Sequence, residues 1–192
     1  MKIIRSGIAV LALLLLCAGC AKTAPPAPAP MPDPGEPGTL AITLTYEKQS
    51  GVASNQFAVW IEDEDGKLIK TVYATQFTAT KGYKNRPDSL AVWVARATGV
   101  SDFDAVAGAT PKSGPVTCVW DLTDEGGNAV PAGVYRFLVE GTLRWKDHVV
   151  YTGEIEIGGD HAVAAAVPAF VCKDNASERG MIGAVTAEYF SQ

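Results

Sequence analysis

The sequence has few histidines, no surplus of basic charge and none of the common catalytic motifs. His148 and His161 are its only histidines, and they lie in separate turns without partners at the spacing of metal ligands. The acidic turns 63–65 and 121–128 lack the alternating oxygen ligands of calcium-binding loops. We therefore predict no metal site. We find no G-x-S-x-G elbow, P-loop, dinucleotide fingerprint or H-E-x-x-H motif, and therefore expect no self-contained catalytic activity. Sixteen basic and 21 acidic residues give a net charge of −5, which argues against a nucleic-acid partner.

The N-terminal apolar run is too short for a permanent membrane helix. It covers residues 8–16 behind Lys2 and Arg5, which is typical of a signal peptide, and we assign residues 1–19 to one. The run ends in L-C-A-G-C, which is similar to a bacterial lipobox with Cys20 as the lipidated residue. Cleavage after Ala18 or Gly19 by an ordinary signal peptidase is the alternative. We therefore expect an extracytoplasmic protein, anchored to a membrane through a lipid on Cys20.

A proline-rich stretch follows the signal peptide. Prolines recur through residues 25–37 among small and acidic residues without apolar periodicity, so residues 20–38 are predicted to be an extended, fairly stiff tether. The folded domain is assigned to residues 39–192.

Two cysteines, Cys118 and Cys172, lie in that domain. In an oxidising compartment they are candidates for a disulfide. Two buried free thiols are the alternative, and only the distance between the cysteines decides.

The domain consists of short strand patterns separated by turn signals. Leu40–Tyr46 alternates apolar and polar residues as a half-buried strand does, Gln56–Asp63 repeats the pattern, and Leu68–Ala74 returns after the Asp65-Gly66 turn. Residues 78–87 are expected to form a loop, and 90–97 a short helix rather than a strand. The remaining strands are expected in Val116–Leu122, Gly133–Leu143, Trp145–Ile157, Ala162–Cys172 and Met181–Phe190. The stretch Trp145–Ile157 is expected to contain a hairpin with its turn at 146–148. The pattern predicts an all-β antiparallel sandwich with one short helix.

The segment Val119–Tyr135 carries the fold resemblance. Its W-D…G-x-x-V-P-x-G-x-Y pattern is similar to immunoglobulin-like domains of flagellar hook-capping proteins. The resemblance implies an immunoglobulin-like sandwich and no particular function.

A longer resemblance runs from about Phe57 to the C-terminus. Its pieces are F-A-V-W-I-E-D-E-D-G-K-L-I-K-T, K-G-Y at 81–83, R-P-D-S-L at 86–90 and D-A-V-A-G-A-T-P-K-S-G at 104–114. They resemble the domain of unknown function 2271 family, predicted periplasmic proteins encoded beside flavin transferases and membrane flavin-reductase components. The resemblance implies a role in extracytoplasmic, flavin-linked electron transfer.

The D-x-x-x-G-A-T motif is the candidate site. Asp104, Gly108, Ala109 and Thr110 resemble the segment on which flavin transferases attach FMN to a threonine through a phosphoester, which would make Thr110 the modified residue. A threonine hydroxyl is a weak nucleophile, so the transferase must bring it beside the FAD diphosphate, and the loop must be accessible. Small Gly108 and Ala109 lower the steric cost, and Asp104 would orient the segment. An ordinary loop, its threonine hydroxyl satisfied by local backbone, is the alternative.

Basic residues near this motif extend the candidate site. Arg86 and Lys112, with Lys81 and Lys84, are candidates to contact a flavin phosphate, and Tyr83 or Trp93 to stack on the ring. A solvated loop and a core Trp93 are the alternative. The function expected is a membrane-tethered FMN carrier, served by a flavin transferase and membrane flavin-reductase components. The alternative is a non-catalytic immunoglobulin-like module that docks on a membrane reductase or another envelope partner.

Overall fold

A computed structural model describes residues 32–50, 55–97, 99, 106–144, 146–171 and 180–192. The predicted signal peptide, Cys20, most of the tether, Asp104 and Cys172 lie outside these residues. No helix in the described ranges is long and apolar enough to cross a membrane.

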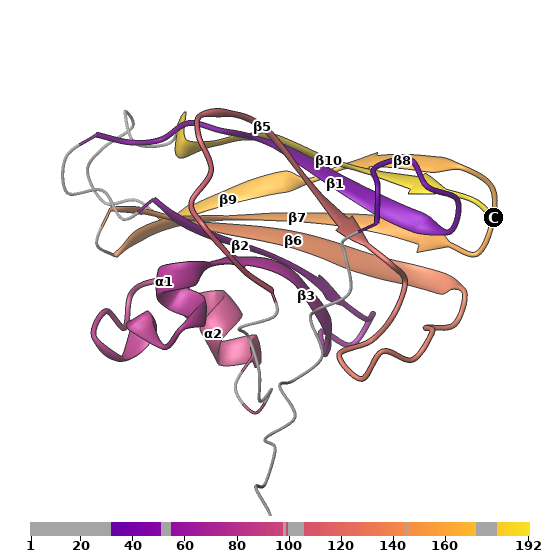
Figure 1. Cartoon of the computed structure of the whole chain (residues 1–192), viewed down its shortest axis with the longest axis horizontal. Helices are drawn as coiled ribbons and strands as arrows, with labels where there is room; N and C mark the ends of the chain where they lie inside the picture. The colour runs from indigo at the N-terminus through magenta and orange to yellow at the C-terminus, as the bar shows by residue number, and fades with distance from the viewer. Residues whose placement is uncertain (1–31, 51–54, 98, 100–105, 145, 172–179) are drawn as a thin grey trace, which may run out of the picture.

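The described residues form two sheets stacked face to face (Figure 1). Sheet A is antiparallel, in the order β5 (Gly114–Trp120), β1 (Thr39–Tyr46), β10 (Ile182–Phe190) and β8 (Ala162–Ala165). Sheet B has the order β4 (Ala107–Gly108), β3 (Leu68–Thr75), β2 (Gln56–Glu62), β6 (Gly133–Arg144), β7 (Asp147–Ile157) and β9 (Val167–Val171). All its pairings are antiparallel except that of β4 with β3. The predicted all-β sandwich is confirmed.

The main core lies between the sheets. In β1, Leu40, Ile42 and Leu44 alternate onto the inner face and are fully buried, because side chains of a strand point alternately to its two faces. They pack in one cluster with inward residues of sheet B such as Phe57 and Phe137. At about 25 cal/mol per Å² of apolar surface, this burial is the main term that stabilises the sandwich.

A helical layer covers the other face of sheet B (Figure 1). It contains α1 (Gln76–Ala79), the 3₁₀ turn η1 (Gly82–Lys84) and α2 (Ala91–Ala97). The helix predicted at 90–97 is therefore confirmed, whereas the loop predicted at 78–87 is wrong in part. A short buried chain of hydrogen bonds holds this turn region: Thr78 Oγ1 donates to Gln56 Oε1 (3.1 Å) and lies 2.9 Å from Ser89 Oγ.

The helical layer also corrects the prediction for β2. Every residue of β2 is buried, so the half-buried strand expected for Gln56–Asp63 is wrong. Phe57 and Ile61 face sheet A, while Ala58 and Trp60 belong to a second apolar cluster with Trp93 of α2. The strand is apolar on both faces because both faces are covered.

Candidate functional site

The candidate site is the Thr110 loop, residues 107–113, which begins as the outer strand of sheet B. Ala107 pairs with Ala74 and Gly108 with Thr75 in a parallel ladder at the end of β3. The motif, which was expected to be a loop, therefore includes a short strand at Ala107 and Gly108. Their small side chains let this backbone approach β3 closely enough to pair.

Tyr73 of β3 holds the loop at this end. Its phenol donates a hydrogen bond to the carbonyl oxygen of Ala109, at 2.9 Å. A Cβ atom on Gly108 would lie 2.2 Å from the ring carbon Cε2 of Tyr73, so the ring occupies the space in which a side chain would stand. Gly108 is thus required by a close contact within this protein.

The Tyr73 ring is itself fixed by the core. It stacks on fully buried Phe57, with ring centroids 4.9 Å apart and an interplanar angle of 24°. Burial raises the pKa of Tyr73 to about 12, with smaller contributions from Cys118 and Tyr46. The phenol therefore stays protonated at neutral pH and remains a donor.

The other end of the Thr110 loop is tied to the end of β1. The backbone N–H of Lys48 donates to Ser113 Oγ (2.9 Å), and this hydroxyl lies 3.3 Å from Glu47 Oε1, to which it donates. β5 starts at the next residue, Gly114. The loop is consequently anchored at both ends, on β3 and on β1.

Thr110 lies between these anchors and is exposed, as are Ala109 and Lys112. We find no hydrogen bond from the Thr110 hydroxyl to the described part of the chain, so the local backbone bond of the ordinary-loop interpretation is not seen there. Pro111 follows, and a proline disfavours the helical region for the residue before it. The arrangement presents one exposed hydroxyl at a position where Pro111 favours an extended backbone.

Apart from Lys112, the other predicted site residues lie outside the Thr110 loop. Arg86 is half-buried between η1 and α2, and its backbone N–H donates to Gly82 O at 3.0 Å. Lys81 and Lys84 are exposed on the turn around η1. Trp93 is 1% exposed and its indole N–H donates to Thr71 Oγ1 (3.3 Å), so it is a core residue and not a stacking platform. Asp104 lies outside the described residues.

Three residues that hold the loop were missed from the sequence: Tyr73, Glu47 and Ser113. Tyr73 and Ala109 are 36 positions apart, and Ser113 and Glu47 are 66 apart. The strand pattern Leu68–Ala74 contains Tyr73, but it gives no signal that this tyrosine faces the motif.

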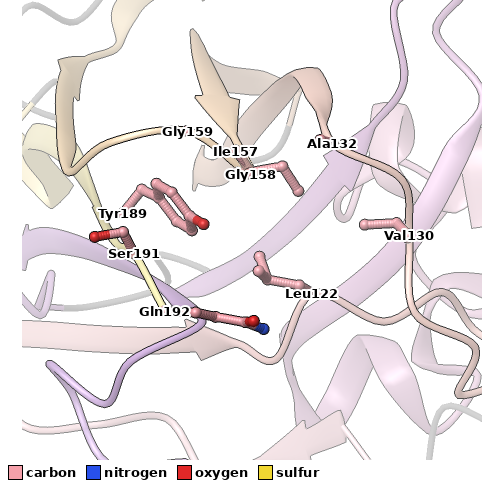
Figure 2. Close-up of a pocket in the computed structure, with 9 residues that line it drawn as sticks. All are labelled: Leu122, Val130, Ala132, Ile157, Gly158, Gly159, Tyr189, Ser191 and Gln192. Atoms are coloured by element: carbon pink, nitrogen blue, oxygen red, sulfur yellow. The ribbon is translucent and has the colours of Figure 1, made fainter.

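A pocket lies at the opposite end of the sandwich (Figure 2). It measures about 280 Å³ and is lined by Leu122, Val130, Ala132, Ile157, Gly158, Gly159, Tyr189, Ser191 and Gln192. Leu122 lies two residues beyond the end of β5, whereas the Thr110 loop precedes its first residue, so the two sites are separated by the length of that strand. The lining has no histidine, cysteine or acidic side chain, and among the described residues no group of three or more metal-ligating side chains is found.

Cys118 lies on β5 and is a buried free cysteine in the described structure. Burial raises its pKa to about 12, so the thiol is protonated and unreactive at neutral pH. Cys172 lies outside the described residues, and the pairing of the two stays a prediction.

Comparison with known proteins gives one match. Residues 39–169 match the model of a family described as predicted periplasmic protein (DUF2271), a stretch that runs from β1 to within β9 and includes the whole Thr110 loop. No curated protein and no solved structure matches the chain significantly.

Proposed function

Because the chain belongs to the DUF2271 family of predicted periplasmic proteins, we propose that it is an extracytoplasmic lipoprotein that carries FMN on Thr110 for flavin-linked electron transfer. The observation that supports this proposal is the exposed Thr110 hydroxyl on a loop anchored at both ends. A substrate hydroxyl for another enzyme must be reachable, and rigid flanks reduce the entropy lost when the loop is bound.

The modification is a phosphoryl transfer from FAD. Thr110 Oγ attacks the phosphorus atom on the riboflavin side of the diphosphate, the new O–P bond forms, the bridging O–P bond breaks, and AMP leaves. The proton of the hydroxyl passes to a base of the transferase, since no carboxylate or imidazole in the described part of this chain hydrogen-bonds Thr110. Once attached, FMN supplies reversible electron uptake.

The neighbouring residues have simpler roles in this proposal. Ala109 is small and leaves the surface beside the hydroxyl open to a transferase cleft, while Gly108 makes room for the Tyr73 ring. Asp104 orients the segment, and Lys112 and Arg86 supply positive charge for the phosphate. Membrane flavin-reductase components are the proposed electron partners.

The lipid on Cys20 and the tether of residues 20–38 hold the domain at the membrane in this proposal. The end of the tether supports a firm junction: the N–H of Gly38 donates to the carbonyl of Phe190 at 2.7 Å, next to the first residue of β1. A firm junction limits how the domain moves relative to the tether, while the stiff proline-rich tether sets its distance from the membrane.

The test is FMN incorporation by the full chain, co-expressed with a flavin transferase and measured by intact mass and peptide mapping. We expect one FMN on wild type, one on Thr110→Ser and none on Thr110→Ala. Thr152→Ala is the matched control, because Thr152 is another exposed threonine, on β7. A wild-type chain that stays unmodified while a known acceptor is modified would overturn the proposal.

A non-catalytic binding module is the second candidate, and exposed valines favour it. Val163 of β8 and Val167 and Val171 of β9 are 65%, 72% and 55% exposed, on the outer strands of the two sheets. An exposed apolar outer strand offers unpaired backbone groups with which another chain can pair. Partner binding that survives Thr110→Ala but is lost with Val167→Lys would favour the module.

A further inference from the structure

We infer that Tyr73 is the positioning residue for Thr110: it fixes the backbone of Gly108 and Ala109 against β3 and so presents the next residue, Thr110, in one orientation. The inference rests on the proposed function, because it concerns the delivery of that hydroxyl to a transferase. It adds a residue that lies outside the motif, on a different strand.

The first argument is the position of the hydrogen bond. The Ala109 carbonyl that accepts from Tyr73 belongs to the peptide group that also contains the Thr110 nitrogen. A peptide group is planar, so a bond to its oxygen fixes the plane from which the Thr110 side chain starts. On the other side, Pro111 disfavours the helical region for Thr110 and so favours an extended conformation. Both backbone neighbours of Thr110 are thereby restricted.

The second argument is the contact with Gly108. The Tyr73 ring fills the space of the missing Gly108 side chain, and Gly108 is paired with Thr75. The ring and the ladder together hold the first two residues of the loop. Tyr73 has little freedom of its own, because it stacks on Phe57, whose N–H donates to Thr75 Oγ1 at 3.3 Å. The packing of Tyr73 against the core therefore also restricts the conformation of the loop.

A preordered acceptor binds its enzyme more tightly. If the loop samples other conformations, the apparent affinity falls by the fraction of molecules that hold the correct one. Loss of the Tyr73 hydroxyl should therefore raise KM for the acceptor protein and leave kcat nearly unchanged. A residue that only stabilises the fold would not produce this split.

The experiment compares Tyr73→Phe with Tyr135→Phe. Tyr135 of β6 makes the same type of bond, donating to the Pro131 carbonyl at 2.9 Å, but at the opposite end of the sandwich. Each variant keeps its ring and loses one hydrogen bond to a carbonyl. The full chain, without FMN, is offered at several concentrations to purified flavin transferase with FAD, and FMN incorporation is timed by mass. We expect Tyr73→Phe to lower kcat/KM about fivefold through KM, the factor that one neutral hydrogen bond corresponds to, and Tyr135→Phe to behave as wild type.

Hydrogen exchange gives a readout that does not depend on FMN. We expect faster amide exchange at residues 108–110 and 112 in Tyr73→Phe, and wild-type rates there in Tyr135→Phe. If wild type is modified and the two variants are modified equally well, Tyr73 is not the positioning residue while the proposed function stands. If wild type takes up no FMN, both the proposed function and the positioning role of Tyr73 are wrong.

Discussion

Gly108 is the residue whose role changes most when the structure is considered. In the motif its small size suits an enzyme cleft, but in the folded protein its missing side chain is replaced by the ring of Tyr73. The requirement for glycine is internal, because a Cβ atom at 2.2 Å from a ring carbon forces either the ring or β4 to move.

We therefore expect Gly108→Ala to destabilise the protein by about 1–3 kcal/mol, the usual cost of overpacking, and to slow FMN incorporation. Gly159→Ala is the control, because nothing lies within 4 Å of a Cβ atom built there. Urea unfolding measures both. In a Tyr73→Ala background the clash is absent, so Gly108→Ala should cost much less there. Equal costs in both backgrounds would contradict the contact.

The sequence predicted an accessible Thr110 and left Trp93 open between ring stacking and a core position, but it did not predict the contacts of Tyr73. The motif consists of consecutive residues, so its resemblance to a modified segment can be recognised from the sequence alone. The bond from Tyr73 to Ala109 depends on which strand lies beside β4, and a parallel pairing of two residues leaves no pattern in the sequence. Which strand pairs with β4 depends on the arrangement of all the strands in the sheet.

Cys118 gives a second prediction at this scale. Because its thiol is buried and its pKa is raised to about 12, we expect no labelling by iodoacetamide in the native protein at neutral pH. After denaturation without reductant, labelling of the Cys118 peptide would mean a free thiol, and labelling only after reduction would mean the disulfide with Cys172. Rapid labelling of the native protein would contradict the burial.

At the scale of elements, α2 begins on a carboxylate from a distant strand. The two oxygens of Glu140, on β6, accept from the N–H groups of Val92 (3.2 Å) and Trp93 (2.8 Å) in the first turn. The N–H of Leu90, just before the helix, donates to Thr142 Oγ1 at 2.8 Å. Side chains of the sheet thus satisfy the free donors of the helix N-terminus, a role usually filled by a local cap.

Glu140 should make stability depend on pH. Burial raises its pKa above the ordinary 4.5, while the bonds from Trp93 and Val92 and the charge of His148 act in the opposite direction. An acid with a raised pKa contributes stability that is complete below its ordinary value and is lost as the pH rises through the folded value.

Relative to Glu140→Gln, wild type should therefore lose stability as the pH rises above 4.5, the ordinary pKa of the carboxyl group. Urea unfolding at several pH values measures the difference. Glu156→Gln removes an exposed carboxylate of β7 and should leave the pH profile unchanged. If the difference in stability between wild type and Glu140→Gln does not vary with pH, the pKa of Glu140 is not raised by its burial.

Elements with a strong pattern were predicted well, and those that depend on their neighbours were not. The alternation of Leu40–Tyr46 identifies β1 from the segment itself. The helix at 90–97 was predicted correctly, although its strand-forming residues also fitted a strand. The four residues of α1 have no period to detect, and the burial of β2 on both faces follows only once the helices are placed on sheet B.

For the whole molecule, the important division is between two apolar cores. The larger lies between the sheets and the smaller between sheet B and the helices, where Trp93 packs with Leu90, Trp60 and Ala58. The Thr110 loop is connected to both, because Ala107 packs against the smaller core and Tyr73, which donates to the Ala109 carbonyl, packs against the larger one. The presentation of Thr110 should thus depend on the helical layer as well as on the sandwich.

Two tryptophan truncations test this division. Trp93→Ala removes a 1% exposed side chain from the smaller core and Trp120→Ala a 1% exposed one from the larger, and each should cost about 3–5 kcal/mol where the site cannot collapse. Native-state hydrogen exchange locates the loss. We expect Trp93→Ala to speed exchange in α2 and β4 while β1 and β10 keep most of their protection, because local units open at their own free energies. Trp120→Ala should speed exchange in the strands of both sheets. If Trp93→Ala instead weakens β1 and β10 as much as α2, the two cores unfold as one unit, and the Thr110 loop is as stable as the sandwich itself.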